Sequence, residues 1–396
     1  MRILVAPDCF TGTLTAPQAA EAMAEGWRRG APHDEIALLP LADGGPGFLE
    51  AVRRGLGGEL VPTTVPGPLG EPAPAAVLLV EGERGRTAYV ESAHAIGLHL
   101  VPPGRRDPGR TSSYGLGLLL RAAIDLDVSR VVVGLGGSAT NDAGAGLLAG
   151  LGLGAATLRD GGEALARAVP EDLAGLHALR GELAGIDLVI ATDVDVPLLG
   201  LHGASAGFAQ QKGADPEQAQ RLERALGHWA QVVAGVAAEE APRPSLLAPA
   251  TGSSAAREAF RSLTQLPGSG AAGGAGFALA LLGGRVLPGA RVVAEAVGLG
   301  ARLAESDLVL TGEGTLDWQS LHGKVVAAVA AEGLEHAVPV VAVAGQVAIG
   351  RREWGAAGLA GVYALAERPE ELARALAAPA ESLVARVARV ARTWSR

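Results

Sequence analysis

The chain alternates short apolar runs with longer stretches in which apolar residues recur at helical spacing. Runs of four to six residues, many of them Val, Ile and Leu, predict buried strands, and the periodic stretches predict helices. The predicted strands are Arg2–Pro7, Ile36–Pro40, Leu60–Val65, Ala75–Val80, Thr87–Glu91, Val131–Gly134, Leu188–Thr192, Leu308–Thr311, Pro339–Ala344 and Gly361–Leu365. The predicted helices are Ser112–Ile124, Pro216–Val233, Gly274–Leu282, Val292–Leu303, Leu321–Ala331, Pro369–Trp394 and one that begins near Ala16. This alternation is typical of an α/β protein with a mostly parallel sheet.

The first helix has its own start signal. Thr15 and Gln18 have the spacing of a capping box, in which each side chain accepts a hydrogen bond from the other residue's backbone N–H. Pro17 follows in the first turn, where a proline N–H would have no partner in any case. The sequence therefore predicts a helix from about Ala16.

The length of 396 residues exceeds what a single hydrophobic core usually holds, so two domains are expected. Three stretches rich in Pro and Gly predict linkers: Pro66–Pro74, Ala241–Ser253, which could instead be a surface loop, and Gly283–Gly289. The segments before the first stretch and after the third each carry about three strands, which together would form a sheet of about six. We therefore predict a discontinuous Rossmann-like α/β domain (1–70 and 285–396) with a second α/β domain (71–284) inserted into it.

The charge, the apolar runs and the cysteine count of the chain argue against several classes of function. The net charge of −9 is spread along the chain without basic blocks, which argues against nucleic acid as a partner. No apolar run reaches 18 residues and the first residues read as a strand, so we expect neither a membrane span nor a signal peptide. Cys9 is the single cysteine, so no disulfide can form within the chain. A cytoplasmic protein, monomer or homodimer, is the expectation.

Acidic residues follow several predicted strands. They are Asp8, Asp43, Asp193 with Asp195, and Glu313 with Asp317. A single acid at the end of a strand is commonly just a helix cap. Four such ends are harder to explain in that way, because ligands of open α/β sheets bind where the strands run out into loops. Carboxylates gathered there suit Mg²⁺, which takes one or two of them together with substrate phosphates, or the activation of a hydroxyl nucleophile.

A glycine-rich loop with hydroxyl side chains follows the strand Val131–Gly134 and contains Ser138, Ala139, Thr140 and Asn141. Glycines let backbone N–H groups approach an anion, so the loop is interpreted as a cradle for a phosphate or a carboxylate, with a helix start after it. Two alternatives stay open. The loop could be a tight packing turn, or the relaxed dinucleotide fingerprint Gly134-x-Gly136-x-x-Ala139 of an NAD enzyme, although no second strand ends in an acid about 20 residues on.

Lysine is used at only two positions, Lys212 and Lys324, although the chain has 33 lysines and arginines together. Because an ammonium is a compact point charge and a guanidinium a planar fork, these are candidates for sites that only Lys fits. Lys324 lies downstream of the acidic, glycine-rich segment Thr311–Gly314 and is the stronger candidate for an anionic substrate. A compositional bias that left two lysines by chance is the plainer explanation.

Taken in order, these motifs resemble the bacterial glycerate kinase family, in the branch that phosphorylates the 2-hydroxyl. The segments that carry the resemblance span nearly the whole chain: Ala6–Leu14, Leu41–Gly45, Gly67–Gly70, Thr111–Gly115, Gly136–Asp142, Asp193–Asp195, Gly203–Ser205, Gln211–Gly213 and Thr311–Gly314. The resemblance implies two α/β domains with an active cleft between them, ATP as phosphoryl donor, glycerate as acceptor, and Mg²⁺. Two departures are Thr11, where the family usually has Lys, and Pro46, where it usually has Glu.

Roles follow from the logic of phosphoryl transfer, in which positioning and charge neutralisation supply most of the rate. Asp193 would orient or deprotonate the acceptor hydroxyl, Lys324 would neutralise phosphate charge, and Asp8 would act in catalysis and, with Asp43 and Glu313, bind the metal. The residues expected to bind substrate or phosphate are Ser138, Ala139, Thr140, Asn141, Asp43, Gly44, Gly45, Lys212, Glu313, Asp317 and Ser320. Three rivals stay open: an NAD-dependent oxidoreductase of a small hydroxy acid, a non-catalytic binding protein, and a kinase that has moved to another small hydroxy acid.

Overall fold

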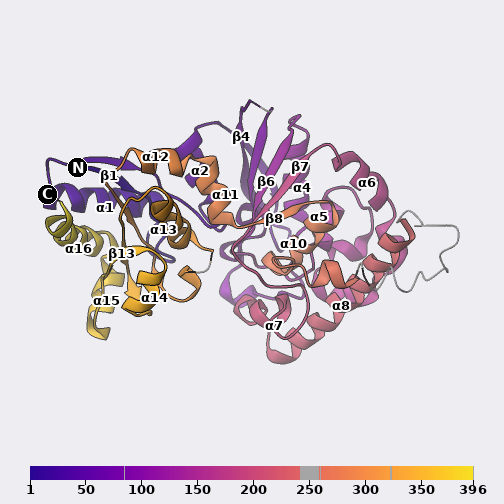
Figure 1. The fold of residues 1–396 in the computed structure, drawn as a ribbon. Helices are drawn as coiled ribbons and strands as arrows, with labels where there is room; N and C mark the ends of the chain where they lie inside the picture. Colours follow the sequence, from indigo (N-terminus) through magenta and orange to yellow (C-terminus); the bar gives the residue numbers. More distant parts are fainter. Residues whose placement is uncertain (84, 241–257, 259, 322, 396) are drawn as a thin grey trace. The chain divides into compact units, whose positions relative to one another are not determined.

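The computed structural model describes residues 1–83, 85–240, 258, 260–321 and 323–395, and it divides into two compact α/β units (Figure 1). The first unit consists of Met1–Gly57 and Pro288–Arg396, and the second, inserted into it, of Gly58–Leu287. The boundaries from the sequence, at 70/71 and 284/285, differ from these by 13 and 3 residues. The expected linker Ala241–Ser253 lies outside the described residues.

The first unit is built on a five-stranded parallel sheet with the order β13-β11-β9-β1-β2. Its strands are β1 (Arg2–Val5), β2 (Glu35–Leu38), β9 (Leu308–Thr311), β11 (Val340–Ala344) and β13 (Leu359–Ala364). Ile3 of β1 pairs with Leu308 of β9, so the two ends of the chain share one sheet, which has five strands and not about six. Residues of β9 and β11 are buried throughout, which explains their continuous apolar runs.

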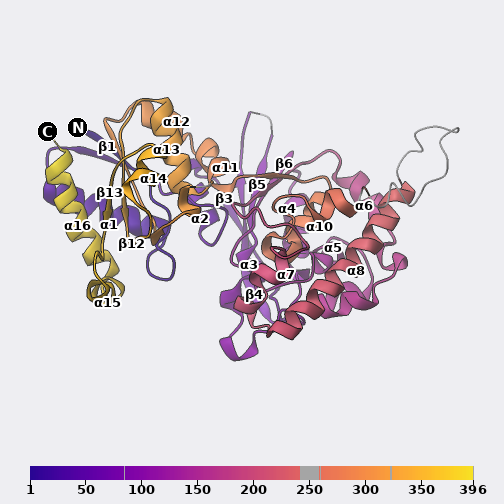
Figure 2. The same cartoon turned by 60° about the horizontal axis from the view of Figure 1, so that its bottom comes forward.

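Two helices that are distant in sequence cover the first unit's core. Helix α1 (Ala16–Gly30) begins with the predicted capping box, and α16 (Pro379–Trp394) packs beside it, as Figures 1 and 2 show. A Cβ on Gly26 of α1 would lie 2.6 Å from the Val384 carbonyl oxygen, so glycine permits this close approach. Met23 and Trp27 of α1 are fully buried in the same cluster as Val387.

Two of the predicted helices of this unit are each interrupted. The stretch Val292–Leu303 forms α11 (Gly289–Ala296) and α12 (Leu299–Ala304), because Gly298 between them has a φ of +69°. The stretch Pro369–Trp394 forms α15 (Pro369–Ala377) and α16, because Pro379 cannot continue a helix interior. The unit's remaining elements are α2 (Phe48–Leu56), α13 (Val325–Glu335), α14 (Arg351–Ala356), and a small sheet of β10 (Thr315–Leu316) and β12 (Gln346–Val347).

The second unit is built on a mixed six-stranded sheet with the order β3-β4-β5-β6-β7-β8. The strands are β3 (Glu59–Pro66), β4 (Pro72–Val80), β5 (Thr87–Glu91), β6 (Arg130–Gly134), β7 (Asp187–Ala191) and β8 (Arg285–Leu287). Strands β5 to β8 are parallel, whereas β3, β4 and β5 form an antiparallel meander. The expectation of a linker at Pro66–Pro74 is therefore wrong: Pro66 pairs with Pro72 at the tip of a hairpin, where a missing N–H is tolerated.

Helices on this sheet bury a second core that contains Trp229 and Phe277. They are α3 (Ala93–Ile96), α4 (Tyr114–Ile124), α5 (Ala145–Gly150), α6 (Leu176–Leu183), α7 (Ala204–Phe208), α8 (Pro216–Glu240) and α10 (Ala271–Leu281). Helices α7 and α8 contact each other, and Figure 2 shows the long helix α8 along the outer side of this unit.

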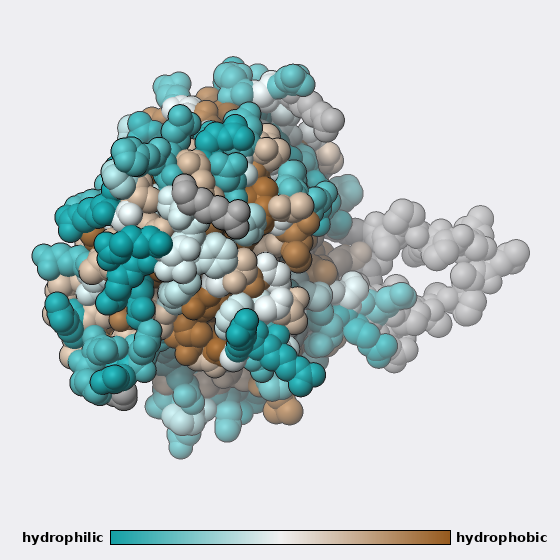
Figure 3. Space-filling model, turned by 60° about the vertical axis from the view of Figure 1, so that its left-hand side comes forward, coloured by the Kyte–Doolittle hydropathy of each residue, from teal (hydrophilic) through white to brown (hydrophobic). Residues whose placement is uncertain are grey.

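The surface seen in Figure 3 carries hydrophilic side chains over most of its area, with smaller hydrophobic patches between them. Among the described residues, no helix combines the length and the apolar character that crossing a membrane requires.

Candidate active-site residues

Three carboxylates of the first unit lie near one another after its strands; we call Asp8, Asp43 and Glu313 the acidic cluster. Asp8 follows β1 and Glu313 follows the neighbouring strand β9, and the Asp8 N–H donates to the Gly312 carbonyl at 2.9 Å. Asp8 and Glu313 are each 7% exposed. Asp43 is half-buried and accepts a hydrogen bond from the Gly45 N–H at 3.0 Å, after the left-handed turn at Gly44.

Burial and mutual repulsion disfavour negative charge on the carboxylates of the acidic cluster. Burial, followed by the charges of Asp43 and Glu313, raises the pKa of Asp8 well above its usual range, although the Cys9 N–H donates to it at 2.6 Å. Burial also raises the pKa of Glu313 to about 7, partly offset by a hydrogen bond with Ser320 and by the charge of Lys324. The buried oxygen Oε1 of Glu313 has no hydrogen-bond partner in the described part of the chain. A bound cation would relieve all three conditions.

The cluster fits Mg²⁺ better than a metal held by protein ligands alone. Within residues 1–83, 85–240, 258, 260–321 and 323–395, no group of three or more His, Cys, Asp or Glu side chains is arranged to hold a metal ion. Mg²⁺ usually keeps several waters and takes only one or two carboxylates in addition to substrate phosphates. Two carboxylates of the acidic cluster would be sufficient for that mode.

The polar residues of the loop after β9 have two roles: some hold the turn of the loop, and Lys324 lies beside Glu313. The Asp317 carboxylate accepts from the Gln319 N–H at 2.8 Å and the Ser320 N–H at 3.2 Å, and Ser320 Oγ accepts from the Asp317 N–H at 2.9 Å. These two side chains hold the loop's own turn, and Ser320 also lowers the pKa of Glu313 through a side-chain hydrogen bond. Lys324, half-buried, is the N-cap residue of α13 and lies close enough to Glu313 to lower that residue's pKa.

Lys212, in the second unit, is the centre of a second set of contacts, which we call the lysine cluster (Lys212, Ser138 and Thr140). The Lys212 ammonium nitrogen lies 2.9 Å from Ser138 Oγ and 2.7 Å from the Thr140 carbonyl oxygen. Its side chain is 4% exposed, and burial lowers its pKa to about 7, with Asp142 acting in the opposite direction. The sequence placed Lys212 among the substrate-binding residues, and the structure gives its nitrogen two acceptors from the protein.

Asp142 organises the glycine-rich loop and was missed as a site residue from the sequence. Its fully buried carboxylate accepts from the Ser113 N–H at 2.7 Å, from Ser113 Oγ at 2.8 Å, and from the Gly144 N–H at 3.1 Å. Burial nevertheless raises its pKa. The Ser113 and Asp142 pair connects segments 29 residues apart, which no local spacing could reveal.

The other predicted residues of the second unit lie around the same sheet edge. Asn141 is fully buried; its Nδ2 donates to Ser205 Oγ at 3.0 Å, while its Oδ1 has no partner among the described residues. The Ala139 N–H donates to the Ile96 carbonyl at 2.7 Å, so Ala139 anchors the loop. Asp193 is half-buried just beyond β7, the strand that pairs with β6, from which the loop leaves.

The dinucleotide interpretation of this loop does not fit its geometry. In that motif a helix begins within the glycine turn, and its N-terminus meets the pyrophosphate. Here β6 ends at Gly134 and α5 begins only at Ala145, as a helix of six residues. The expected helix start therefore lies beyond the loop, and Ser138 to Asn141 are held by tertiary contacts.

Comparisons with known proteins agree across the chain. The model of the glycerate kinase family matches residues 3–395. A glycerate kinase of Halalkalibacterium halodurans is 35% identical, covering 100% of this chain and 99% of the relative. A glycerate 2-kinase of Escherichia coli is 36% identical, covering 88% and 86%. The crystal structure of a protein assigned as glycerate kinase 2 in Salmonella typhimurium LT2 matches with a TM-score of 0.74 at 36% identity, covering 99% and 98%.

Proposed function

The chain belongs to the glycerate kinase family and is a kinase that acts on glycerate, and we propose that it takes the phosphoryl group from ATP with Mg²⁺ and delivers it to the 2-hydroxyl. The observation that carries this proposal is the acidic cluster. Burial raises the pKa of Asp8 and of Glu313, and Glu313 Oε1 has no hydrogen-bond partner among the described residues, so a cation beside Asp8, Asp43 and Glu313 would stabilise their charge. Phosphoryl transfer uses such a cation.

On the first unit, Asp8, Asp43 and Glu313 would hold Mg²⁺, two of them as direct ligands. At these carboxylates, bound Mg²⁺ would supply neutralisation of phosphate charge. Lys324 adds a positive charge beside Glu313, and we propose that its ammonium meets a phosphate oxygen whose charge grows in the transition state. The free backbone N–H groups at the start of α13 favour an anion at the same point.

On the second unit, the loop from Ser138 to Asn141 would bind the carboxylate of glycerate, with Asp193 at the same sheet edge to orient the acceptor hydroxyl. Asn141 Oδ1, buried without a partner among the described residues, can accept a hydrogen bond from a substrate hydroxyl. Lys212 already has two protein acceptors, so we assign it to holding the loop in shape and not to direct contact with phosphate.

A coupled ADP-release assay with glycerate and a panel of other small hydroxy acids tests this proposal, with the product identified by phosphorus NMR. The expected result is ADP release that requires Mg²⁺ and glycerate, with phosphorus on the 2-oxygen. The absence of ADP release with every acid would contradict the choice of donor. Phosphorus on the 3-oxygen would contradict only the regiochemistry.

A kinase for a different hydroxy acid is the second candidate, and two positions favour it. Thr11 is exposed and uncharged where the family usually has Lys, and Pro46 is exposed where it usually has Glu. The residues that shift the pKa of Asp8 therefore include no cation. If another acid gives a kcat/KM at least tenfold above that of glycerate, this candidate replaces the first.

A further inference from the structure

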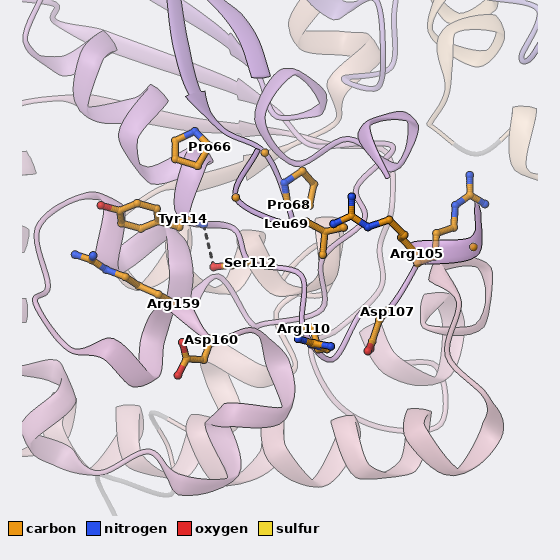
Figure 4. A pocket seen from close by; sticks show the side chains of 14 residues that line it. Pro66, Pro68, Leu69, Arg105, Asp107, Arg110, Ser112, Tyr114, Arg159 and Asp160 are labelled. Carbon is orange, nitrogen blue, oxygen red and sulfur yellow. Dashed lines mark hydrogen bonds between the residues drawn. The ribbon is translucent and has the colours of Figure 1, made fainter. Parts of the chain in front are cut away.

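A cavity of about 830 Å³ lies in the second unit, and none of its lining residues has a role assigned above in binding the metal, the phosphate or glycerate. Its walls come from the β3–β4 turn, from the segment between Gly104 and Tyr114, and from the 3-10 turn Ala156–Arg159. Figure 4 shows Arg159 and Tyr114 on one side, Arg105 and Arg110 on the other, and Pro66, Pro68 and Leu69 between them. Its volume lies within the range of about 300–1,000 Å³ that is common for small-molecule sites.

The cavity gathers positive charge in a chain whose net charge is −9. Of its four arginines, Arg105 is paired with Glu71 at 2.8 Å. The other three, Arg106, Arg110 and Arg159, have no carboxylate partner in the described part of the chain. The buried Nε of Arg106 has no hydrogen-bond partner there either. Three guanidinium groups are therefore available to an anion.

The acidic residues that line the cavity do not balance the positive charge of its arginines. Asp107 is held by hydrogen bonds from the Gly109 N–H at 3.0 Å and from Gln218 Nε2 at 2.7 Å, which fix its carboxylate against the wall. Asp160 is exposed. Four arginines thus face two aspartates around a single cavity, and one of those aspartates already has donors from the protein.

One arginine is preorganised for an anion. The Arg159 guanidinium lies over the ring of Tyr114, with 4.5 Å between its central carbon and the ring centroid. Stacking of this kind fixes the guanidinium plane and leaves its N–H edge free to donate two parallel hydrogen bonds to a phosphate or carboxylate. Tyr114 is also the first residue of α4, whose N-terminal dipole favours negative charge.

The segments that line the cavity are joined to the lysine cluster by a hydrogen bond and by close backbone packing. Thr111 Oγ1, in the segment that carries Arg110, donates to the Ala139 carbonyl at 2.9 Å. Gly213, next to Lys212, packs so tightly on the backbone of Arg106 that an added Cβ would lie 2.4 Å from its carbonyl oxygen. Any ligand that draws the arginines together would therefore act on the backbone that holds Ser138 and Lys212.

We propose that this cavity binds a small phosphorylated anion with at least two negative groups. Phosphate fits best because a guanidinium meets two of its oxygens at once, and three unpaired guanidinium groups can serve more than one such group. Both a nucleoside diphosphate and a phosphorylated organic acid have this chemistry. This site goes beyond the proposed function, because none of its lining residues is among those assigned there to the metal, the phosphate or glycerate.

Isothermal titration calorimetry of the full chain, in EDTA so that no metal bridges a probe to the acidic cluster, tests the proposal. The probes are inorganic pyrophosphate, ADP and 3-phosphoglycerate, each titrated separately. The double variant Arg110→Gln/Arg159→Gln removes two exposed charges and should leave the fold intact. Arg224→Gln, at an exposed position of α8 in the same unit, is the matched control.

At least one probe should bind the parent saturably, and the double variant should raise its Kd at least tenfold while Arg224→Gln stays within twofold. ADP alone identifies a nucleotide as the ligand, 3-phosphoglycerate alone a phosphorylated acid, and pyrophosphate alone a site for the phosphate groups only. Binding of the parent that the double variant leaves unchanged would place the probe elsewhere and overturn the proposal, as would the absence of saturable heat with all three. Neither result depends on which phosphoryl donor the enzyme uses.

Discussion

Raising the pH from 7 to 9 should stabilise the second unit by about 2 kcal/mol more in the parent than in Lys212→Gln. The reason is the buried ammonium of Lys212, whose pKa burial lowers from the ordinary 10.5 to about 7. Between these two values the unfolded chain binds more protons than the folded one, so stability rises with pH. Below the folded-state pKa both states are protonated, and the full cost of burying the charge remains.

The magnitude follows from linkage. One proton of difference is worth about 1.4 kcal/mol per pH unit, and the whole shift therefore corresponds to at most about 5 kcal/mol. Folded Lys212 is already half deprotonated near pH 7, which reduces the gain over two pH units to about 2 kcal/mol. The glutamine side chain of the variant keeps an N–H donor for Ser138 or Thr140 but does not titrate, so the difference between the two proteins isolates the lysine.

Urea denaturation followed by fluorine NMR provides the assay, because Trp229 is the single tryptophan between residues 58 and 287. Its 5-fluorotryptophan signal reports unfolding of the second unit separately from the first. Arg224→Gln, which removes an exposed charge on α8 and leaves Lys212 in place, should have the same pH dependence as the parent. Parallel pH profiles for the parent and Lys212→Gln would refute the reasoning, and so would a parent that loses stability toward pH 9.

Three further outcomes are expected. Asp193→Asn should lower kcat by about 10²–10⁴ with an unchanged melting temperature if this carboxylate orients or deprotonates the hydroxyl, and rates within a few-fold of the parent would exclude that role. Lys324→Arg should lower kcat at least about tenfold in steady-state kinetics, because a broader guanidinium fits a phosphate contact at the start of α13 badly; unchanged kcat would mean that the lysine is there by chance. Gly273→Ala should cost at least about 2 kcal/mol of unfolding free energy in urea titrations, because its φ is +69° and an added Cβ would lie 1.9 Å from the Thr140 carbonyl oxygen, whereas Gly227→Ala, with open space around it, should be neutral or stabilising.

The features predicted correctly from sequence were those with local causes. The capping box of α1 depends on residues three apart, and it is present as expected. The predicted strands are present because buried strands are continuous apolar runs of four to six residues. The short strands β8, β10 and β12 were missed, and the prediction of a linker at Gly283–Gly289 is wrong for Arg285–Leu287, because these residues form β8, which pairs with β7. The order of motifs along the chain identified the family, which the family model confirms.

The features that could not be predicted from sequence depend on contacts between segments that are distant along the chain. The stretch from Pro66 to Pro72 has the composition of a linker, and only its pairing across β3 and β4 makes it a hairpin tip. Asp142 looked like one more acid in a glycine-rich loop, and its role depends on Ser113, which lies in another element. The arginine-lined cavity is likewise assembled from three separate segments, and although Arg105, Arg106 and Arg110 are close in sequence, only the fold brings Arg159 and Tyr114 to the same cavity.

The two lysines now differ in a way that composition could not reveal. The Lys212 side chain is buried against Ser138 and Thr140. Its ammonium can lose its proton there, because burial lowers its pKa to about 7. A guanidinium at the same place would remain charged at any accessible pH. At Lys324 the side chain is half-buried at a helix start beside Glu313, where its positive charge lowers the pKa of that carboxyl. The Lys212 site therefore requires a cation that can be neutralised, and the phosphate contact proposed for Lys324 would require a compact one. Arginine meets neither requirement, which gives a physical reason for keeping lysine at both positions in a chain that otherwise uses arginine.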